Sequence, residues 1–166
     1  MPRILQSKNP PENTGRSVGA PALFASFPEE LQAELRIKAI RRSFSPGQFL
    51  HHRGDKADGF WIVENGQVKC GHQDAHGNMH VLFILGSGDS FGEPACLGQF
   101  ERVLDIEALG EVDMLWVSDK IFSEVMGRSP DISREMLKIL AKQLQEALDN
   151  LLVFRNMSAP KRLAQR

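Results

Sequence analysis

Short apolar segments separated by glycine-containing turns fill the middle of the chain. The predicted strands are Gln48–His51, Gly59–Glu64, Gln67–His72, His80–Leu85, Val103–Ala108 and Met114–Ser118. No helical periodicity lies between them, which argues against a parallel sheet with helical crossovers. Many short strands at close spacing predict a mainly β fold, an antiparallel sandwich, roll or barrel.

Amphipathic patterns predict short helices on both sides of the strands. A helix before them has an apolar face of Leu31, Leu35 and Ile40. A second helix follows the last strand, with Ser118 as its N-cap and Met126 near its end. The strands are therefore expected to lie between helical flanks.

A single long helix is predicted for the last third of the chain. Ser129 is suited to cap it, and Pro130 is suited to its first turn. Its apolar positions alternate spacings of three and four: Leu137, Leu140, Leu144, Ala147, Leu151 and Phe154. This narrow stripe is typical of a coiled coil, so we expect a homodimer through this helix; packing on its own domain is the alternative.

Composition narrows the class of protein. Residues 1–21 are rich in Pro, Asn, Ser and Gly and predict a flexible tail. A net charge of −1 gives no overall basic field for nucleic acid. Cys70 and Cys96 lack CxxC spacing, which indicates buried thiols in a reduced, cytoplasmic protein. No apolar run approaches the roughly 20 residues that span a bilayer, so no membrane partner is expected.

The order of the turn glycines along the chain is similar to that of a known family. Gly54–Val68 reads as a hairpin, with a Gly-Asp turn before its first strand and Asn65-Gly66 between its two strands. Pro46-Gly47 lies upstream and Gly88–Glu93 downstream. From about Leu23 to Arg166 the chain resembles the cyclic-nucleotide-binding-like sensor of Crp/Fnr-type transcriptional regulators.

The resemblance implies a domain organisation. An antiparallel β-roll (a double-stranded β-helix or jelly roll) is expected over 22–128 and a dimerisation helix over 129–157. Residues 158–166 resemble the start of a C-terminal winged helix-turn-helix domain. The resemblance implies that DNA is bound only through that domain, and we expect this chain to lack it. The effector implied is a cyclic nucleotide, cyclic AMP or cyclic GMP, or a related small molecule.

Phe91–Arg102 resembles the phosphate-binding cassette of this family. By resemblance, Arg102 pairs with the cyclic phosphate, Glu93 accepts from the ribose 2′-hydroxyl, and Gly92 and Ala95 bring backbone close to the ligand. A guanidinium can contact both free oxygens of a phosphodiester, which gives these roles a chemical basis.

The chain departs from the family pattern at two places. Val103 and Leu104 follow the arginine, where the family has a small or hydroxyl residue and then alanine. Ala147 and Leu148 occupy the helix positions that contact the base, and neither offers a polar group. We expect weak binding with little preference between bases. A different effector, or a degenerate pocket in which Glu93 pairs with Arg102, is the alternative.

Other classes of function find less support. His51 and His52 suggest a cupin-like metal enzyme, but adjacent strand residues face opposite ways. Cys70 and His72 suggest the haem or metal site of gas-sensing family members, on the weak basis of one Cys-x-His. No metal ligands or catalytic residues are assigned, and no nucleophile elbow or Walker loop is present, so no enzyme is expected. A stand-alone effector-binding module remains the main alternative.

Overall fold

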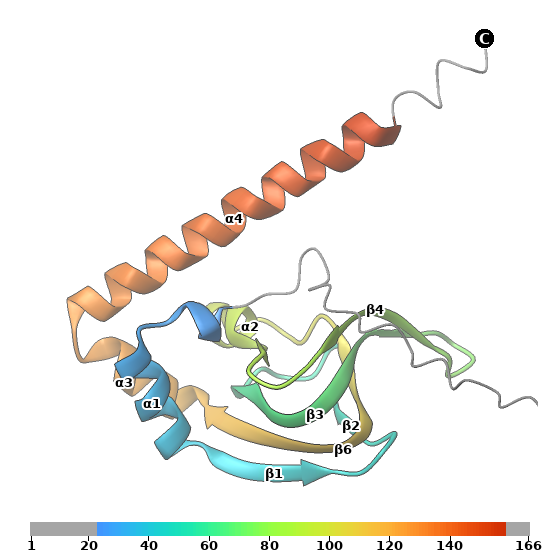
Figure 1. Cartoon of the computed structure of the whole chain (residues 1–166), viewed down its shortest axis with the longest axis horizontal. Helices are drawn as coiled ribbons and strands as arrows, with labels where there is room; N and C mark the ends of the chain where they lie inside the picture. Colours follow the sequence, from blue (N-terminus) through green and yellow to red (C-terminus); the bar gives the residue numbers. More distant parts are fainter. Residues whose placement is uncertain (1–22, 159–166) are drawn as a thin grey trace, which may run out of the picture.

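Two long, bent strands, β3 (Gly59–Gln73) and β6 (Asp105–Ser118), form the centre of the fold. The computed structural model describes residues 23–158. Its strands run in the order β1-β6-β3-β4, with β2 added beside β6 and β5 beside β3, and every pairing is antiparallel. The remaining strands are β1 (Ile40–Phe44), β2 (Phe49–His51), β4 (Met79–Leu85) and β5 (Ser90–Phe91). This rolled sheet with flanking helices confirms the predicted fold class (Figure 1).

The predicted hairpin turn at Asn65-Gly66 is wrong, because β3 runs through both residues. The register of β3 against β6 shifts between Val63 and Asn65 and again between Asn65 and Gln67. Such a shift is the mark of a β-bulge within a continuous strand. Gly66 has φ +88°, and a Cβ there would lie 2.4 Å from the Glu111 carbonyl oxygen. The glycine thus permits a sharp bend with close backbone approach, and the strand does not reverse.

The flanking helices are η1 (Phe24–Ser26), α1 (Glu29–Lys38), α2 (Glu93–Gly98), α3 (Asp119–Gly127) and α4 (Pro130–Ser158). Leu31 and Leu35 are buried on α1, as predicted. Ile40 is instead the first residue of β1 and is 52% exposed. The helix ends earlier because Ala39 is extended, with ψ 153°, and leads into the strand.

Both predicted caps at the C-terminal end are present. The Ser118 hydroxyl accepts a hydrogen bond from the Ile121 amide at 3.3 Å, which caps α3. The Ser129 hydroxyl accepts from the Asp131 amide at 3.3 Å at the start of α4. These local signals alone explain where the two helices begin.

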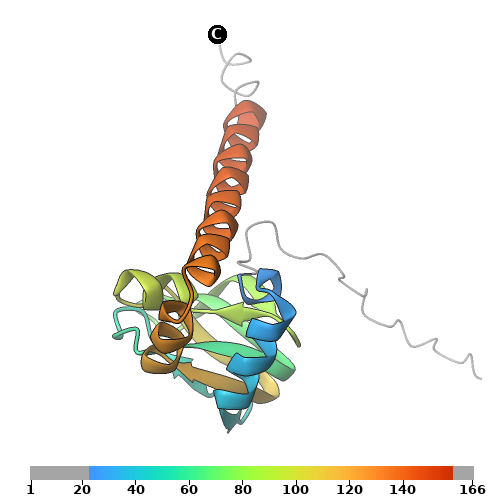
Figure 2. The same ribbon diagram turned by 90° about the vertical axis from the view of Figure 1, so that its left-hand side faces the viewer.

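Helix α4 packs on the domain only through its first turns. Met136 is 2% exposed there, and Ile139 and Leu140 still pack, partly buried, against the core. Beyond Leu140 the helix projects away from the roll (Figures 1 and 2). Leu144 and Leu151 are 62% and 61% exposed. The expected apolar stripe is therefore uncovered along its distal half.

The core has two parts. One lies beneath η1, α1 and α3 and includes Cys96, and the other fills the roll and includes Cys70. Both cysteines are fully buried, which confirms their interpretation as small core residues. Within the part of the chain that the structure describes, no helix is long and apolar enough to cross a membrane.

Two of the predicted domains lie wholly or mostly outside the described residues. The tail 1–21 and nearly all of 158–166 lie outside the described residues, so their organisation stays a prediction.

Candidate functional site

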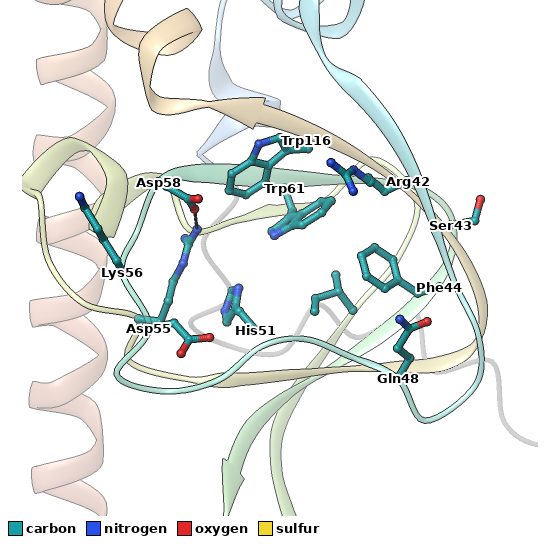
Figure 3. Close-up of a pocket in the computed structure, with 12 residues that line it drawn as sticks. Arg42, Ser43, Phe44, Gln48, His51, Asp55, Lys56, Asp58, Trp61 and Trp116 are labelled. Carbon is teal, nitrogen blue, oxygen red and sulfur yellow. Dashed lines mark ion pairs between the residues drawn. The ribbon is translucent and has the colours of Figure 1, made fainter.

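A cavity of about 550 Å³ opens into the roll. It is lined by Arg42, Ser43, Phe44, Gln48, Leu50, His51, Asp55, Lys56, Asp58, Trp61, Arg102 and Trp116. Trp61 and Trp116 face each other across β3 and β6, with ring centroids 4.6 Å apart. Phe44 packs edge-on against Trp61 at 5.5 Å, so one wall of the cavity is aromatic (Figure 3).

Arg102 is a buried cation at this cavity. Its side chain is 3% exposed, and Nη2 donates to the Gly59 carbonyl oxygen at 2.6 Å. Asp58 Oδ1 lies 3.8 Å from the same nitrogen, but the Asp58 side chain is 72% exposed. Nε and Nη1 are buried and have no hydrogen-bond partner. Burial lowers the pKa of Arg102 and Asp58 opposes this, yet a guanidinium stays charged in proteins.

The Gly-Asp turn of the sequence motif holds the backbone of Arg102. The Gly54 amide donates to the Arg102 carbonyl oxygen at 2.8 Å, and the Arg102 amide donates to the Asp55 carbonyl oxygen at 2.8 Å. A β-bridge between Lys56 and Glu101 continues this pairing. The turn therefore fixes the arginine in place, beside the cavity residues Asp55 and Lys56.

Glu93, at the start of α2, is completely buried but does not line the cavity. Neither of its carboxylate oxygens has a partner with hydrogen-bond geometry. Burial raises the pKa of Glu93 to about 7, and the neighbouring Ser90 hydroxyl, the Phe24 amide and the charge of Arg102 only partly oppose this. The Phe24 amide itself donates to Ser90 Oγ at 3.3 Å. Glu93 is thus a protonatable acid between η1 and the cavity arginine.

His51 lines the cavity as a neutral imidazole. Its Nδ1 is buried without a partner, and its ring contacts Phe91 at 5.7 Å. Burial, together with the charge of Arg102, lowers the pKa of His51 to about 4. The side chain of His52 is 54% exposed, as expected for neighbours that face opposite ways.

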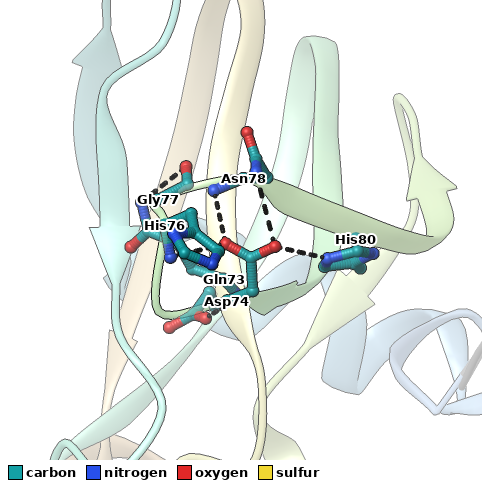
Figure 4. Close-up of polar contacts among 7 residues, drawn as sticks. Gln73, Asp74, His76, Gly77, Asn78 and His80 are labelled. Atoms are coloured by element: carbon teal, nitrogen blue, oxygen red, sulfur yellow. Dashed lines mark hydrogen bonds and ion pairs between the residues drawn. The ribbon is translucent and has the colours of Figure 1, made fainter.

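The remaining histidines lie at a hairpin, as predicted (Figure 4). Asp74 Oδ1 accepts from the amides of His76 and Asn78, both at 2.9 Å, and Oδ2 lies 2.9 Å from His80 Nε2. The His80 contact holds the pKa of Asp74 at about 2. Among the described residues no group of three His, Cys, Asp or Glu side chains is placed to hold a metal.

Cys70 and His72 do not share an environment. Cys70 is buried in the roll, whereas His72 is exposed. A register shift in the pairing of β3 with β4 lies between Cys70 and Gly71, which breaks the simple alternation expected of a Cys-x-His pair.

The structure brings only part of the predicted site together. Arg102 reaches the cavity, and Gly92 lies against its guanidinium. Ala95 is half-buried on α2, while Val103 is 72% exposed. Ala147 and Leu148 are exposed on α4. Neither of them lines the cavity, and neither do Ala95 and Val103. The roles inferred for these residues stay predictions.

Sequence reasoning missed Arg42, Phe44, Trp61 and Trp116. An alternating pattern over 40–44 was the available signal for β1, since Arg42 and Phe44 are two apart. The contact of Trp61 with Trp116 depends on the register of β3 against β6. A local sequence pattern does not predict that register.

Comparison with known proteins agrees with this geometry. Residues 41–129, more than half of the chain, match the cyclic nucleotide-binding domain family. The cyclic AMP receptor protein of Thermus thermophilus is 26% identical over 129 residues, which are 78% of this chain and 59% of that protein. Lysophospholipase NTE1 of Coccidioides immitis is 28% identical over 104 residues, 63% of this chain and 7% of that enzyme.

A solved structure resembles nearly the whole described region. The N-terminal domain of a transcriptional regulator from Streptomyces coelicolor superposes with a TM-score of 0.67 at 25% identity, covering 81% of this chain and 96% of that one. The chain spans less than two thirds of the length of both curated relatives. The chain belongs to the cyclic nucleotide-binding domain family, and its domain is of the Crp/Fnr-like type.

Proposed function

We propose that this domain senses a small phosphate-bearing effector, a cyclic nucleotide, through Arg102. The single observation behind this is the buried guanidinium at the cavity, whose Nε and Nη1 have no partner. Buried donors without acceptors are unfavourable, and an anion that accepts from them removes that cost. The two free oxygens of a cyclic phosphodiester match the fork of a guanidinium.

The rest of the cavity suits the uncharged part of such a ligand. Its volume of about 550 Å³ lies within the usual range for small-molecule sites, roughly 300–1,000 Å³. Trp61, Trp116 and Phe44 offer flat apolar surface for a base. The names of a cyclic AMP receptor protein and of a transcriptional regulator among the relatives support the same reading.

We propose that effector binding acts on the rest of the protein through α4. Its uncovered leucines would pair with those of a second copy, making a homodimer. An effector that binds one arrangement of the paired helices more tightly than another shifts the population toward it. We propose that in a cytoplasmic transcription regulator this shift reorients a DNA-binding domain, with no catalytic step in the sensing domain.

A binding experiment tests the proposal. Cyclic AMP, cyclic GMP and adenosine are titrated into the protein by calorimetry, with thermal unfolding as a second readout. Both cyclic nucleotides should bind and adenosine should not, because it lacks the phosphate. At a hundredfold excess over Kd, binding to the native state adds about 2.7 kcal/mol of stability.

Two variants sharpen this test. Arg102→Ala should weaken binding by about ten- to a hundredfold or more, the loss expected for hydrogen bonds to a charged group. Arg53→Ala removes an arginine of the neighbouring Gly-Asp turn that does not line the cavity, and should leave binding unchanged. Equal binding by Arg102→Ala and the wild type would refute the proposed role of the guanidinium.

A further inference from the structure

A second arginine, Arg42, enters the same cavity from β1. It lies two residues before Phe44, so both side chains share one face of the strand. Phe44 packs against Trp61, which fixes that face toward the roll interior. Figure 3 shows the Arg42 side chain directed toward Trp61, on the opposite side of the cavity from Asp58 and Lys56.

The guanidinium of Arg42 has no ion pair or hydrogen bond with any described residue. Its neighbour Arg41 differs, because Arg41 Nη2 lies 3.0 Å from Glu64 Oε2 and outside this cavity. Among the cavity residues the acids are Asp55 and Asp58, which lie with Lys56 near Arg102. Arg42 therefore faces the cavity without a carboxylate to neutralise it.

Two further polar residues, Ser43 and Gln48, line the same cavity. Gln48 Oε1 accepts from the Ser45 amide at 3.1 Å, which leaves the Gln48 side-chain NH₂ free to donate. The Ser43 hydroxyl donates to Asp113 Oδ1 at 2.7 Å. The cavity thus presents the charged fork of Arg42 and, beyond Phe44, the amide donor of Gln48.

A cyclic nucleotide whose phosphate sits on Arg102 would lay its base along the aromatic wall, with one edge toward Arg42. A guanine-type base presents O6 and N7 as adjacent acceptors, which suit a guanidinium fork. An adenine-type base presents N7 beside the N6 donor, and that amino group would face a cation. Only the guanine-type edge, with its two acceptors, matches the two donors of the Arg42 guanidinium.

Building on the proposed function, we infer that Arg42 is a specificity-determining residue that selects a cyclic 6-oxopurine nucleotide over a cyclic 6-aminopurine nucleotide. The expectation of little base preference rested on Ala147 and Leu148 of α4 alone. Strand β1 supplies the polar reader that those two positions lack.

Calorimetry with cyclic GMP, cyclic IMP and cyclic AMP tests this inference. Cyclic IMP has O6 and N7 but lacks the 2-amino group of guanine, so it isolates the edge that Arg42 would contact. The wild type should bind cyclic GMP and cyclic IMP at least about tenfold more tightly than cyclic AMP, the discrimination typical of a bidentate arginine. Arg42→Ala should remove this preference and keep binding through Arg102.

Two further variants test whether the preference needs the planar guanidinium or only its positive charge, and whether it is particular to Arg42. Arg42→Lys keeps the charge but loses the fork, so the preference should fall toward unity. Arg41→Ala is the matched control on the opposite face of β1, and its preference should equal that of the wild type. Thermal unfolding of each variant checks that the roll is intact.

The outcomes distinguish the inference from the function on which it rests. Cyclic AMP bound as tightly as cyclic GMP, or a preference that survives Arg42→Ala, would overturn the role of Arg42 while leaving a cyclic-nucleotide sensor. Absence of binding by all three nucleotides would overturn the proposed function and the inference with it.

Discussion

Gly92 lies directly against the guanidinium of Arg102. A Cβ at this position would fall 2.4 Å from Arg102 Nη1, and the residue has φ +95°, in the left-handed region. Two independent physical reasons therefore favour glycine here: the backbone conformation and the space that the arginine occupies. The contact links the start of α2 to the cavity.

Gly92→Ala should lower both stability and affinity. The left-handed conformation would cost about 1–2 kcal/mol, and the methyl group would push Arg102 away from the Gly59 carbonyl oxygen. Gly88→Ala is the matched control, since Gly88 has φ +89° but nothing within 4 Å of a Cβ. Urea denaturation and nucleotide calorimetry of both variants check this. Equal loss of affinity in the two variants would show that strain alone is responsible.

Stability should fall as the pH rises from about 5 to 8, because of Glu93. Its pKa is raised in the folded protein from an ordinary 4.5 to about 7, so the native state binds the proton more tightly than the unfolded chain. The stabilisation is complete below the unfolded pKa and is lost as the pH passes the folded pKa, on the order of 3 kcal/mol in all.

Glu93→Gln is the variant that isolates this effect. It cannot ionise, so its free energy of unfolding should lack the decline between pH 5 and 8 that the wild type shows. Denaturant titrations at several pH values give the difference between the two proteins. A difference that is constant with pH would mean that the Glu93 carboxyl titrates normally.

Leu144→Glu should weaken self-association through α4. Leu144 is 62% exposed in the single chain, and a carboxylate there would be buried without a partner if two helices paired. Light scattering should report twice the chain mass for the wild type and less for the variant. Gln145→Glu adds the same charge at the next position, off the stripe, and should remain dimeric. A wild-type monomer at all concentrations would contradict the dimer.

Both thiols should be unreactive in the native protein. Cys70 and Cys96 are fully buried, and burial raises the pKa of each to about 12. Since the thiolate is the reactive form, a thiol reagent should label them only as the chain unfolds. Labelling in native buffer and in denaturant, followed by mass spectrometry, measures this. Rapid native labelling of Cys96 would indicate that α2 opens.

Much of the fold was predictable because its signals are local. The Ser118 and Ser129 caps act over two or three residues, and the leucine stripe of α4 is a matter of spacing along one helix. Arg102 was identified through the resemblance of the short segment Phe91–Arg102 to the family's phosphate-binding cassette. These features depend on near neighbours in the chain, which the sequence displays directly.

The tertiary structure alone decided how these parts meet. Gly66 could have turned a hairpin, and only the pairing of β3 with β6 made it a bulge in one long strand. Trp61 meets Trp116, and Arg42 enters the cavity, through registers between segments far apart in sequence. By itself the sequence determined where α3 and α4 begin, the apolar stripe of α4 and the charge of Arg102. The composition of the cavity came from long-range strand register, because each pairing selects which face of a strand points inward.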